Sequence, residues 1–171
     1  HAFDSLTALA VGNFPWVMRT SDGGTSWNYI PTLSVPGRSF RFNNFYFSDT
    51  RAGWMVGSSF SILKTTDQGL SWQQVLDIPP ASNPVSSTWD DITFADSLHG
   101  WVVGRQGYQD PLRLSFPGRI IRTTDGGTSW LEATPADTIW ELRSVSFMPT
   151  APGCAAVACL RWSIRKCRRR R

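Results

Sequence analysis

One eight-residue motif occurs three times in this chain, and an internal repeat constrains the fold more than any other feature. The copies are TSDGGTSW at residues 20–27, TTDQGLSW at 65–72 and TTDGGTSW at 123–130. All of them keep Asp in the third place, Gly in the fifth, Ser in the seventh and Trp in the eighth. Such a repeat predicts stacked supersecondary units, each of which buries its apolar side against its neighbours.

A second signature precedes each copy of the motif. FSDTRAGWMVG ends at Gly57, FADSLHGWVVG ends at Gly104, and the weaker FDSLTALAVG ends at Gly12. Ten residues separate this final glycine from the motif aspartate in the first and second units, and 21 separate them in the third. The third unit therefore carries an insertion of eleven residues, which lies within residues 105–119.

Each unit, of about 45 residues, contains four short runs of β-branched and aromatic residues bounded by Gly, Asp, Ser and Pro, the pattern expected of strands. No stretch keeps the apolar period of a helix. The predicted strands of the second and third units are residues 45–47, 54–56, 62–65 and 72–76, then 92–94, 101–103, 120–123 and 130–133. Four strands per repeat of this length indicate an all-β fold, a β-propeller of four-stranded blades.

The motif itself has the chemistry of a hairpin turn between the third and fourth strands of a blade. Its aspartate can accept backbone N–H groups of its own turn, and its glycine supplies positive φ. The following Ser and Trp are expected to start the outgoing strand, and the tryptophan should be blade core. We predict a structural rather than catalytic role for Asp22, Gly24, Trp27, Asp67, Gly69, Trp72, Asp125, Gly127 and Trp130.

At these residues the chain resembles the Asp-box, or bacterial-neuraminidase-repeat, proteins, whose pattern is Ser/Thr-x-Asp-x-Gly-x-Thr/Ser-Trp. The GWxVG element at residues 53–57 and 100–104 makes it similar to the photosystem II stability/assembly factor-like propellers. The resemblance covers about residues 1–158. It implies that the Asp boxes lie at the blade periphery, away from the central binding face. We expect an extracellular or periplasmic protein, or one of the thylakoid lumen if the source is a phototroph.

The repeat predicts blades at about residues 1–31, 40–78 and 90–135, and the start of a fourth at 143–158. In the fourth, residues 145–147 are the expected first strand, and residues 153–157 align with the GWxVG elements. Propellers usually close with about four to eight blades. We therefore expect this partial propeller, of about three and a half blades, to be a fragment of a longer protein, or else to close by self-association.

The remaining residues, 159–171, form a basic tail. Seven of the 17 basic residues lie in residues 160–171, which leaves the rest of the chain with 10 basic and 13 acidic residues. The body is therefore mildly acidic, and we expect it to bind no nucleic acid. No apolar run approaches the roughly 20 residues of a membrane span. Cys154, Cys159 and Cys167 match no zinc pattern, and we expect no metal and no cofactor.

The tail has three interpretations. A fourth motif should place Asp-Gly-Gly near Cys167, where a run of arginines stands instead. Asp-Gly-Gly codons read one base out of register can encode Arg-Arg-Arg, so we favour a sequence that leaves its frame around residues 149–159. A solvated basic tail and a working binding tail are the alternatives. An alternative-frame translation of the coding DNA without a motif near this position would refute the first interpretation.

Catalysis finds little support in the residue pattern. Sialidases and xyloglucanases also carry these boxes, but no active-site motif of either can be placed on this chain. Adjacent Asp90 and Asp91 lie at a strand entry, where their side chains should point to opposite faces. Glycosidases need two carboxylates facing one bond. His99 stands in a turn without further metal-binding neighbours in the sequence.

Binding is better supported. Trp89 and Trp140 lie shortly before predicted first strands, on segments that cross between blades near the central face. Arg41 and Arg143 have similar places, and the insertion supplies Tyr108 and Arg113. We predict a non-catalytic binding or assembly scaffold that engages a protein or glycan through its blade-connecting loops. The alternative is a fragment of a propeller glycoside hydrolase whose active-site residues lie mostly outside this chain.

Overall fold

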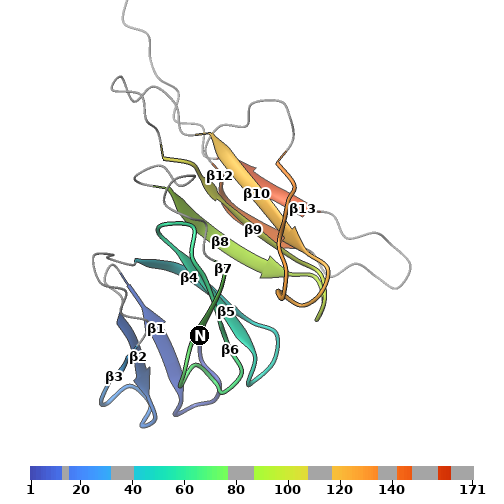
Figure 1. Cartoon of the computed structure of the whole chain (residues 1–171). Helices are drawn as coiled ribbons and strands as arrows, with labels where there is room; N and C mark the ends of the chain where they lie inside the picture. Colours follow the sequence, from blue (N-terminus) through green and yellow to red (C-terminus); the bar gives the residue numbers. More distant parts are fainter. Residues whose placement is uncertain are drawn as a thin grey trace, which may run out of the picture.

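The computed structural model describes residues 1–12, 16–31, 41–76, 87–107, 117–134, 142–147 and 158–162. Within these ranges the strands form four antiparallel sheets, which follow one another in chain order as blades 1 to 4 (Figure 1). Blade 1 holds β1 (Ala8–Val11), β2 (Trp16–Thr20) and β3 (Asn28–Pro31). Blade 2 holds β4 (Phe42–Phe47), β5 (Gly53–Gly57), β6 (Ile62–Thr65) and β7 (Gln73–Leu76). No helix in the described ranges is long and apolar enough to cross a membrane.

Blade 3 repeats blade 2, and blade 4 is represented by two strands. Blade 3 holds β8 (Thr88–Phe94), β9 (Gly100–Arg105), β10 (Gly118–Thr123) and β11 (Leu131–Glu132). Blade 4 holds β12 (Leu142–Phe147) and β13 (Ala158–Trp162). The predicted all-β fold of four-stranded blades, present as a partial propeller, is confirmed. The motif tryptophans lie one residue before the last strands of their blades, β3, β7 and β11, instead of starting them.

Two ends of the repeat differ from the expected pattern. In blade 4 the strand paired with β12 is β13, which runs to Trp162 and so passes residue 158, the expected boundary of the basic tail. Residues 153–157 and 163–171 lie outside the described residues. We call the first strand of blades 2 to 4, which is β4, β8 or β12, the inner strand. In blade 1, β1 corresponds to the second strand of these blades. His1 lies where part of an inner strand would be, since it exchanges backbone hydrogen bonds with Leu9.

The hydrophobic core consists of layers between successive blades. Leu9, Val17 and Ile30 of blade 1 pack against Met55, Leu63 and Trp72 of blade 2. The next layers join Trp54, Val56 and Ile62 to Trp89, Val102 and Ile121, then Val103 and Ile120 to Leu142 and Val145. Full burial of such a side chain contributes about 1.5–3 kcal/mol. Because each layer needs two blades, every blade depends on its neighbours for stability.

Both glycines of the GWxVG element allow close packing on the inner strand. A Cβ added at Gly53 would lie 2.6 Å from the ring of Phe47, and one at Gly100 would lie 2.6 Å from that of Phe94. A Cβ at Gly57 or Gly104 would collide with a backbone carbonyl at the start of the first strand, that of Arg41 just before β4 or that of Thr88, the first residue of β8. The element therefore fixes the distance between the first and second strands of a blade.

The three inner strands share an irregularity at one position. The pairing register shifts between Phe42 and Asn44, between Trp89 and Asp91, and between Leu142 and Ser144. Asn43, Asp90 and Arg143 are therefore the extra residues of three equivalent β-bulges. A bulge re-aims a side chain out of the regular alternation of the strand.

Asp91, the residue after one of these bulges, joins three blades. Its Oδ1 accepts hydrogen bonds from Asn44 Nδ2 of blade 2 and from its neighbour Ile92 N. Its Oδ2 accepts from Ser144 Oγ and Val145 N of blade 4, both at 2.8 Å. Asp91 is buried, so these donors replace its water and fix the spacing of β4, β8 and β12.

We predict that Asp91→Ala lowers the free energy of unfolding by about 3 kcal/mol, because it leaves buried donors on two other blades without an acceptor. Urea unfolding followed by tryptophan fluorescence measures this. Asp91→Asn, which keeps the shape and one acceptor oxygen, should lose less. Unchanged stability in Asp91→Ala would contradict the role of this carboxylate as the acceptor shared by three blades.

Candidate functional site

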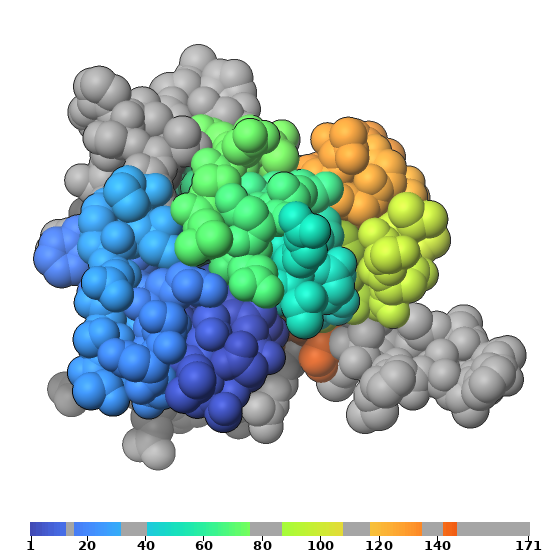
Figure 2. Space-filling model, turned by 90° about the horizontal axis from the view of Figure 1, so that it is seen from below, coloured from blue at the N-terminus to red at the C-terminus, as the bar shows by residue number. Residues whose placement is uncertain are grey.

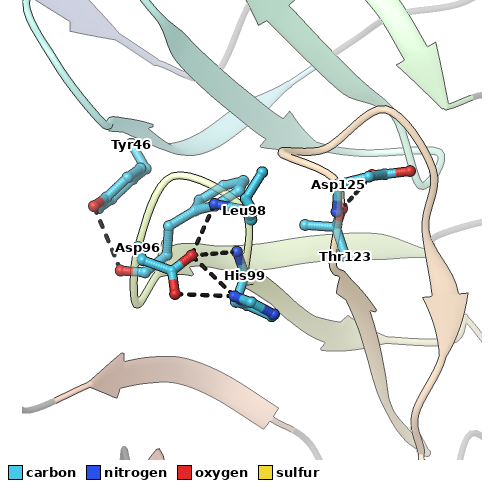
Figure 3. A network of polar contacts seen from close by, with 7 residues as sticks. Tyr46, Asp96, Leu98, His99, Thr123 and Asp125 are labelled. Carbon is cyan, nitrogen blue, oxygen red and sulfur yellow. Dashed lines mark hydrogen bonds and ion pairs between the residues drawn. The ribbon is translucent and has the colours of Figure 1, made fainter.

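Each of the three motif turns, which we call box turns, has the same pattern of internal hydrogen bonds. They are residues 20–27, 65–72 and 123–130. In the third, Thr123 Oγ1 donates to Asp125 Oδ1 at 2.7 Å (Figure 3). The same oxygen accepts from Gly127 N at 2.9 Å. Ser129 donates its N–H to Oδ1 at 2.9 Å and its hydroxyl to Oδ2 at 2.6 Å. Asp22 and Asp67 accept the same bonds from their own turns. Both carboxylate oxygens are thus engaged within the turn.

These bonds favour the ionised carboxylate. The hydroxyl and N–H of Ser26, then Thr20, lower the pKa of Asp22 to about 2, and Ser129 and Thr123 do the same for Asp125. Burial opposes the effect at Asp67, but the bonds from Ser71 and Thr65 outweigh it and its pKa is also lowered. An aspartate that stays ionised and is saturated by its own turn makes a poor general acid or base.

A second set of turns is joined to the box turns. Asp4, Asp49 and Asp96 each accept backbone N–H groups two and three residues ahead, such as those of Leu98 and His99 for Asp96 (Figure 3). The carbonyl of Leu98 then accepts Gly126 N at 3.0 Å, and the same bond joins blades 1 and 2 to their own boxes. The acidic residue of the second signature therefore also has a local structural explanation.

His99 belongs to this turn. Its Nδ1 lies 2.9 Å from Asp96 Oδ2, and both side chains are about half exposed. Within the described ranges, no group of three or more His, Cys, Asp and Glu side chains is placed to hold a metal ion.

The box tryptophans do not share one environment. Trp72 is 6% exposed, Trp130 is half-buried and Trp27 is 41% exposed. The expectation that all of them are blade core is wrong for Trp27. Trp72 is enclosed because blade 1 packs on the same face of blade 2, whereas no described residue supplies such a layer for Trp27.

Trp89 is not part of a binding surface. Its side chain is fully buried, with its ring centroid 4.5 Å from that of Phe60 in blade 2. The guanidinium of Arg119 lies 5.8 Å from the same ring. The prediction that Trp89 lines a ligand face is therefore wrong, because the bulge at the next residue leaves Trp89 directed into the layer between blades 2 and 3. Trp140, Tyr108 and Arg113 lie outside the described residues.

The other predicted positions meet at one end of the inner strands, opposite the box turns. Arg41 and Arg143 are exposed there, the first just before β4 and the second at the bulge of β12. Asn43 is exposed at the equivalent bulge of β4, and Asp90 lies 3.9 Å from Arg105 at that of β8. We call this surface, Arg41, Asn43, Asp90, Arg105 and Arg143, the bulge face. The sequence reasoning missed Asn43 and Arg105. Aligning the three inner strands on their aromatic ends could have found Asn43, whereas Arg105 lies at the end of β9.

The adjacent aspartates have separate partners, as their alternation predicted. Asp90 is directed to Arg105, whereas Asp91 bonds to blades 2 and 4. They do not face a shared space, so they do not form the carboxylate pair of a glycosidase.

Comparison with known proteins supports the predicted resemblance. The family model described as "Photosynthesis system II assembly factor YCF48" matches residues 3–80. Photosystem II stability/assembly factor HCF136, chloroplastic, of Arabidopsis thaliana is 31% identical over 127 residues, 72% of this chain and 27% of that protein. A solved structure, "YCF48 bound to D1 peptide", has a TM-score of 0.58 and 27% identity, and covers 86% of this chain and 43% of its own.

A second solved structure shows the fold alone. The GH74 xyloglucanase of Xanthomonas campestris has a TM-score of 0.55 at 12% identity, and covers 78% of this chain and 21% of its own. The chain is thus a partial β-propeller similar to the photosystem II stability/assembly factors. It spans about a quarter of the length of the Arabidopsis relative.

The box turns generate a stability prediction. Gln68 has a φ of 62°, at a position where the other boxes have Gly23 and Gly126. A left-handed non-glycine residue costs about 1–2 kcal/mol, part of which glycine returns through its greater freedom in the unfolded chain. Gln68→Gly should therefore stabilise the protein by about 0.5–1 kcal/mol in urea unfolding. The reverse change, Gly126→Ala, should destabilise it; a loss of stability in Gln68→Gly would contradict the account.

A second prediction concerns acid. The folded pKa of Asp22 is lowered from 3.8 to about 2, so its stabilisation is complete above about pH 4 and is lost as pH falls toward 2. Asp125 should add the same dependence. Urea unfolding at several pH values between about 2 and 6 measures the slope. Asp22→Asn should be less stable at neutral pH and lose less on acidification; an unchanged slope would argue against these bonds.

Proposed function

We propose that this chain is part of a non-catalytic assembly scaffold that binds an extended segment of a partner protein at the bulge face. The observation that carries the proposal is the equivalent bulge in β4, β8 and β12. Bulges recur where a strand presents a side chain for recognition. Here they place the exposed Asn43 and Arg143 at the same end of their blades, while Asp90, whose side chain is 11% exposed, lies beside Arg105.

The chemistry of the bulge face suits a polypeptide ligand. Arg41 and Arg143 are exposed residues, and arginine is the side chain best suited to bind carboxylates and backbone carbonyls through paired hydrogen bonds. Asn43 already donates to Thr88 Oγ1 and to the carbonyl of Trp89, so its own carbonyl oxygen can accept from a ligand N–H. The opposite ends of the blades, which carry the box turns, have fewer acceptors for a ligand, because the box carboxylates already accept hydrogen bonds from their own turns.

The comparisons support the same class of function. The relatives are assembly factors by name, and one solved neighbour is bound to a D1 peptide. The alternative function, that of a glycoside hydrolase, is supported only by the similarity of fold to the xyloglucanase. A glycan ligand stays a prediction, and a glycan array would test it.

The proposed location is extracellular or periplasmic, or the thylakoid lumen in a phototroph. The Arabidopsis relative, which is chloroplastic by name, supports the last case. Fractionation of cells that express the tagged full-length protein would test this, and recovery in the cytoplasm alone would contradict it.

We predict that Arg143→Glu and Arg41→Glu each weaken binding of a labelled D1 peptide at least about tenfold, since a charge-assisted hydrogen bond contributes about 1.5–3 kcal/mol. Fluorescence anisotropy of overlapping D1 peptides measures this. Arg51→Glu is the matched control, because Arg51 is exposed in a turn at the opposite end of blade 2. Binding that only Arg51→Glu weakens would place the site at the box turns.

A further inference from the structure

The residue that follows each bulge occupies an equivalent position on its inner strand. These residues are Asn44 on β4, Asp91 on β8 and Ser144 on β12. Asn44 Nδ2 donates a hydrogen bond to one carboxylate oxygen of Asp91, and Ser144 Oγ donates to the other at 2.8 Å. We call Asn44, Asp91 and Ser144 the inner-strand row. Side chains from one position of the repeat thus join three blades.

The carboxylate of Asp91 brings blades 2 and 4 together, although blade 3 lies between them in the chain. In Figure 2 part of β12, in orange-red, is visible beside the cyan residues of blade 2. Asn43 and Arg143, the exposed bulge residues, directly precede the two donors of the inner-strand row. An extended chain advances about 3.3 Å per residue, so one short segment is long enough to contact both of these bulge residues.

The two exposed bulge residues are held in place in different ways. Asn43 bonds to blade 3 directly, because its Nδ2 donates to Thr88 Oγ1 at 2.6 Å and to the carbonyl of Trp89 at 2.7 Å. Arg143, in contrast, lies directly before Ser144 and Val145, the two donors of blade 4 to Asp91. The position of Arg143 should therefore depend on Asp91 more than the position of Asn43 does.

We propose that Asp91 is the positioning residue of the peptide site, and that it holds Arg143 of blade 4 at the distance from Asn43 of blade 2 that one extended segment requires. The inference rests on the proposed function and adds a ligand that engages blades 2 and 4 at the same time. Asp91 is 8% exposed, so it acts through its neighbours and not through contact with the ligand. Two contacts at the right spacing bind one ligand more tightly than either contact alone.

The substitution Asp91→Asn separates the bonds to blade 2 from those to blade 4. It replaces one acceptor oxygen by an amide nitrogen, which only donates. Directed toward blade 2, this nitrogen would oppose the donors Asn44 Nδ2 and Ile92 N. Directed toward blade 4, it opposes Val145 N alone, because the hydroxyl of Ser144 can rotate and accept. The variant therefore keeps the bonds to blade 2 and loosens blade 4, which carries Arg143.

Fluorescence anisotropy with a labelled D1 peptide tests the proposal. Asp91→Asn should weaken binding about fivefold or more, within the usual range of coupling between two sites. In an Arg143→Ala background the same change should weaken binding less than about twofold, because the contact that Asp91 positions is already absent. Ile62→Val is the control, since it loosens the buried layer between blades 2 and 3 on β6, away from the inner strands. It should leave the affinity unchanged, and urea unfolding checks that each variant is folded.

Amide chemical shifts of the ¹⁵N-labelled chain give a second readout, which needs no ligand. Asp91→Asn should shift the amides of Arg143 and Ser144 in blade 4 more than that of Asn43 in blade 2, and Ile62→Val should shift none of them. Shifts confined to β8, or losses of affinity from Asp91→Asn and Arg143→Ala that simply add, would overturn the inference and leave the proposed function in place. A wild-type chain that binds no D1 peptide would overturn both.

Discussion

The packing of each blade on the one before it is the contact on which the rest of this structure depends. The box turn is part of that contact. A Cβ at Gly69 would collide with Leu9 of blade 1, and one at Gly127 would collide with Trp54 of blade 2. Lys64 adds a hydrogen bond of 3.0 Å to the carbonyl of Gly126 in the next blade, while its ammonium lies over the ring of Trp54. The glycine of the motif thus serves both its own turn and the fit between blades.

The two ends of the packed blades differ in what their polar groups do. At one end, the box turns and the turns of Asp4, Asp49 and Asp96 use their polar groups on one another. At the other, the bulges of the inner strands turn polar side chains out of the regular pairing. Asp91 stabilises the blade packing at the bulge end, because it joins the inner strands β4, β8 and β12 directly beside the bulge of β8. The rigid scaffold is what allows the bulge face to present its groups at fixed spacing.

Local chemistry made most of the fold predictable. The turns have Asp, Gly and Ser at fixed places, and the strands are short apolar runs between them, so the four-stranded blades followed from the repeat. The first strands of blades 2 and 3 begin at residues 42 and 88, earlier than the predicted 45 and 92. Trp89 and Trp27 were misjudged for the same physical reason. Their burial depends on whether a neighbouring blade reaches them, which sequence spacing does not encode. The bulges were also invisible, because a bulge is defined by pairing with a second strand. Asp91 looked like one half of a poor carboxylate pair, since its partners Asn44 and Ser144 lie far away in the sequence.

The central claim is that the bulge face binds a polypeptide while the box turns are structural. Titration of the ¹⁵N-labelled chain with a D1 peptide, followed by backbone amide chemical shifts, tests it most directly. The account predicts that the perturbed amides cluster at residues 41–44, 88–91, 105–106 and 142–144, and that the amides of the box turns stay unchanged. Perturbations centred on Asp22, Asp67 and Asp125, with the inner strands unaffected, would contradict it.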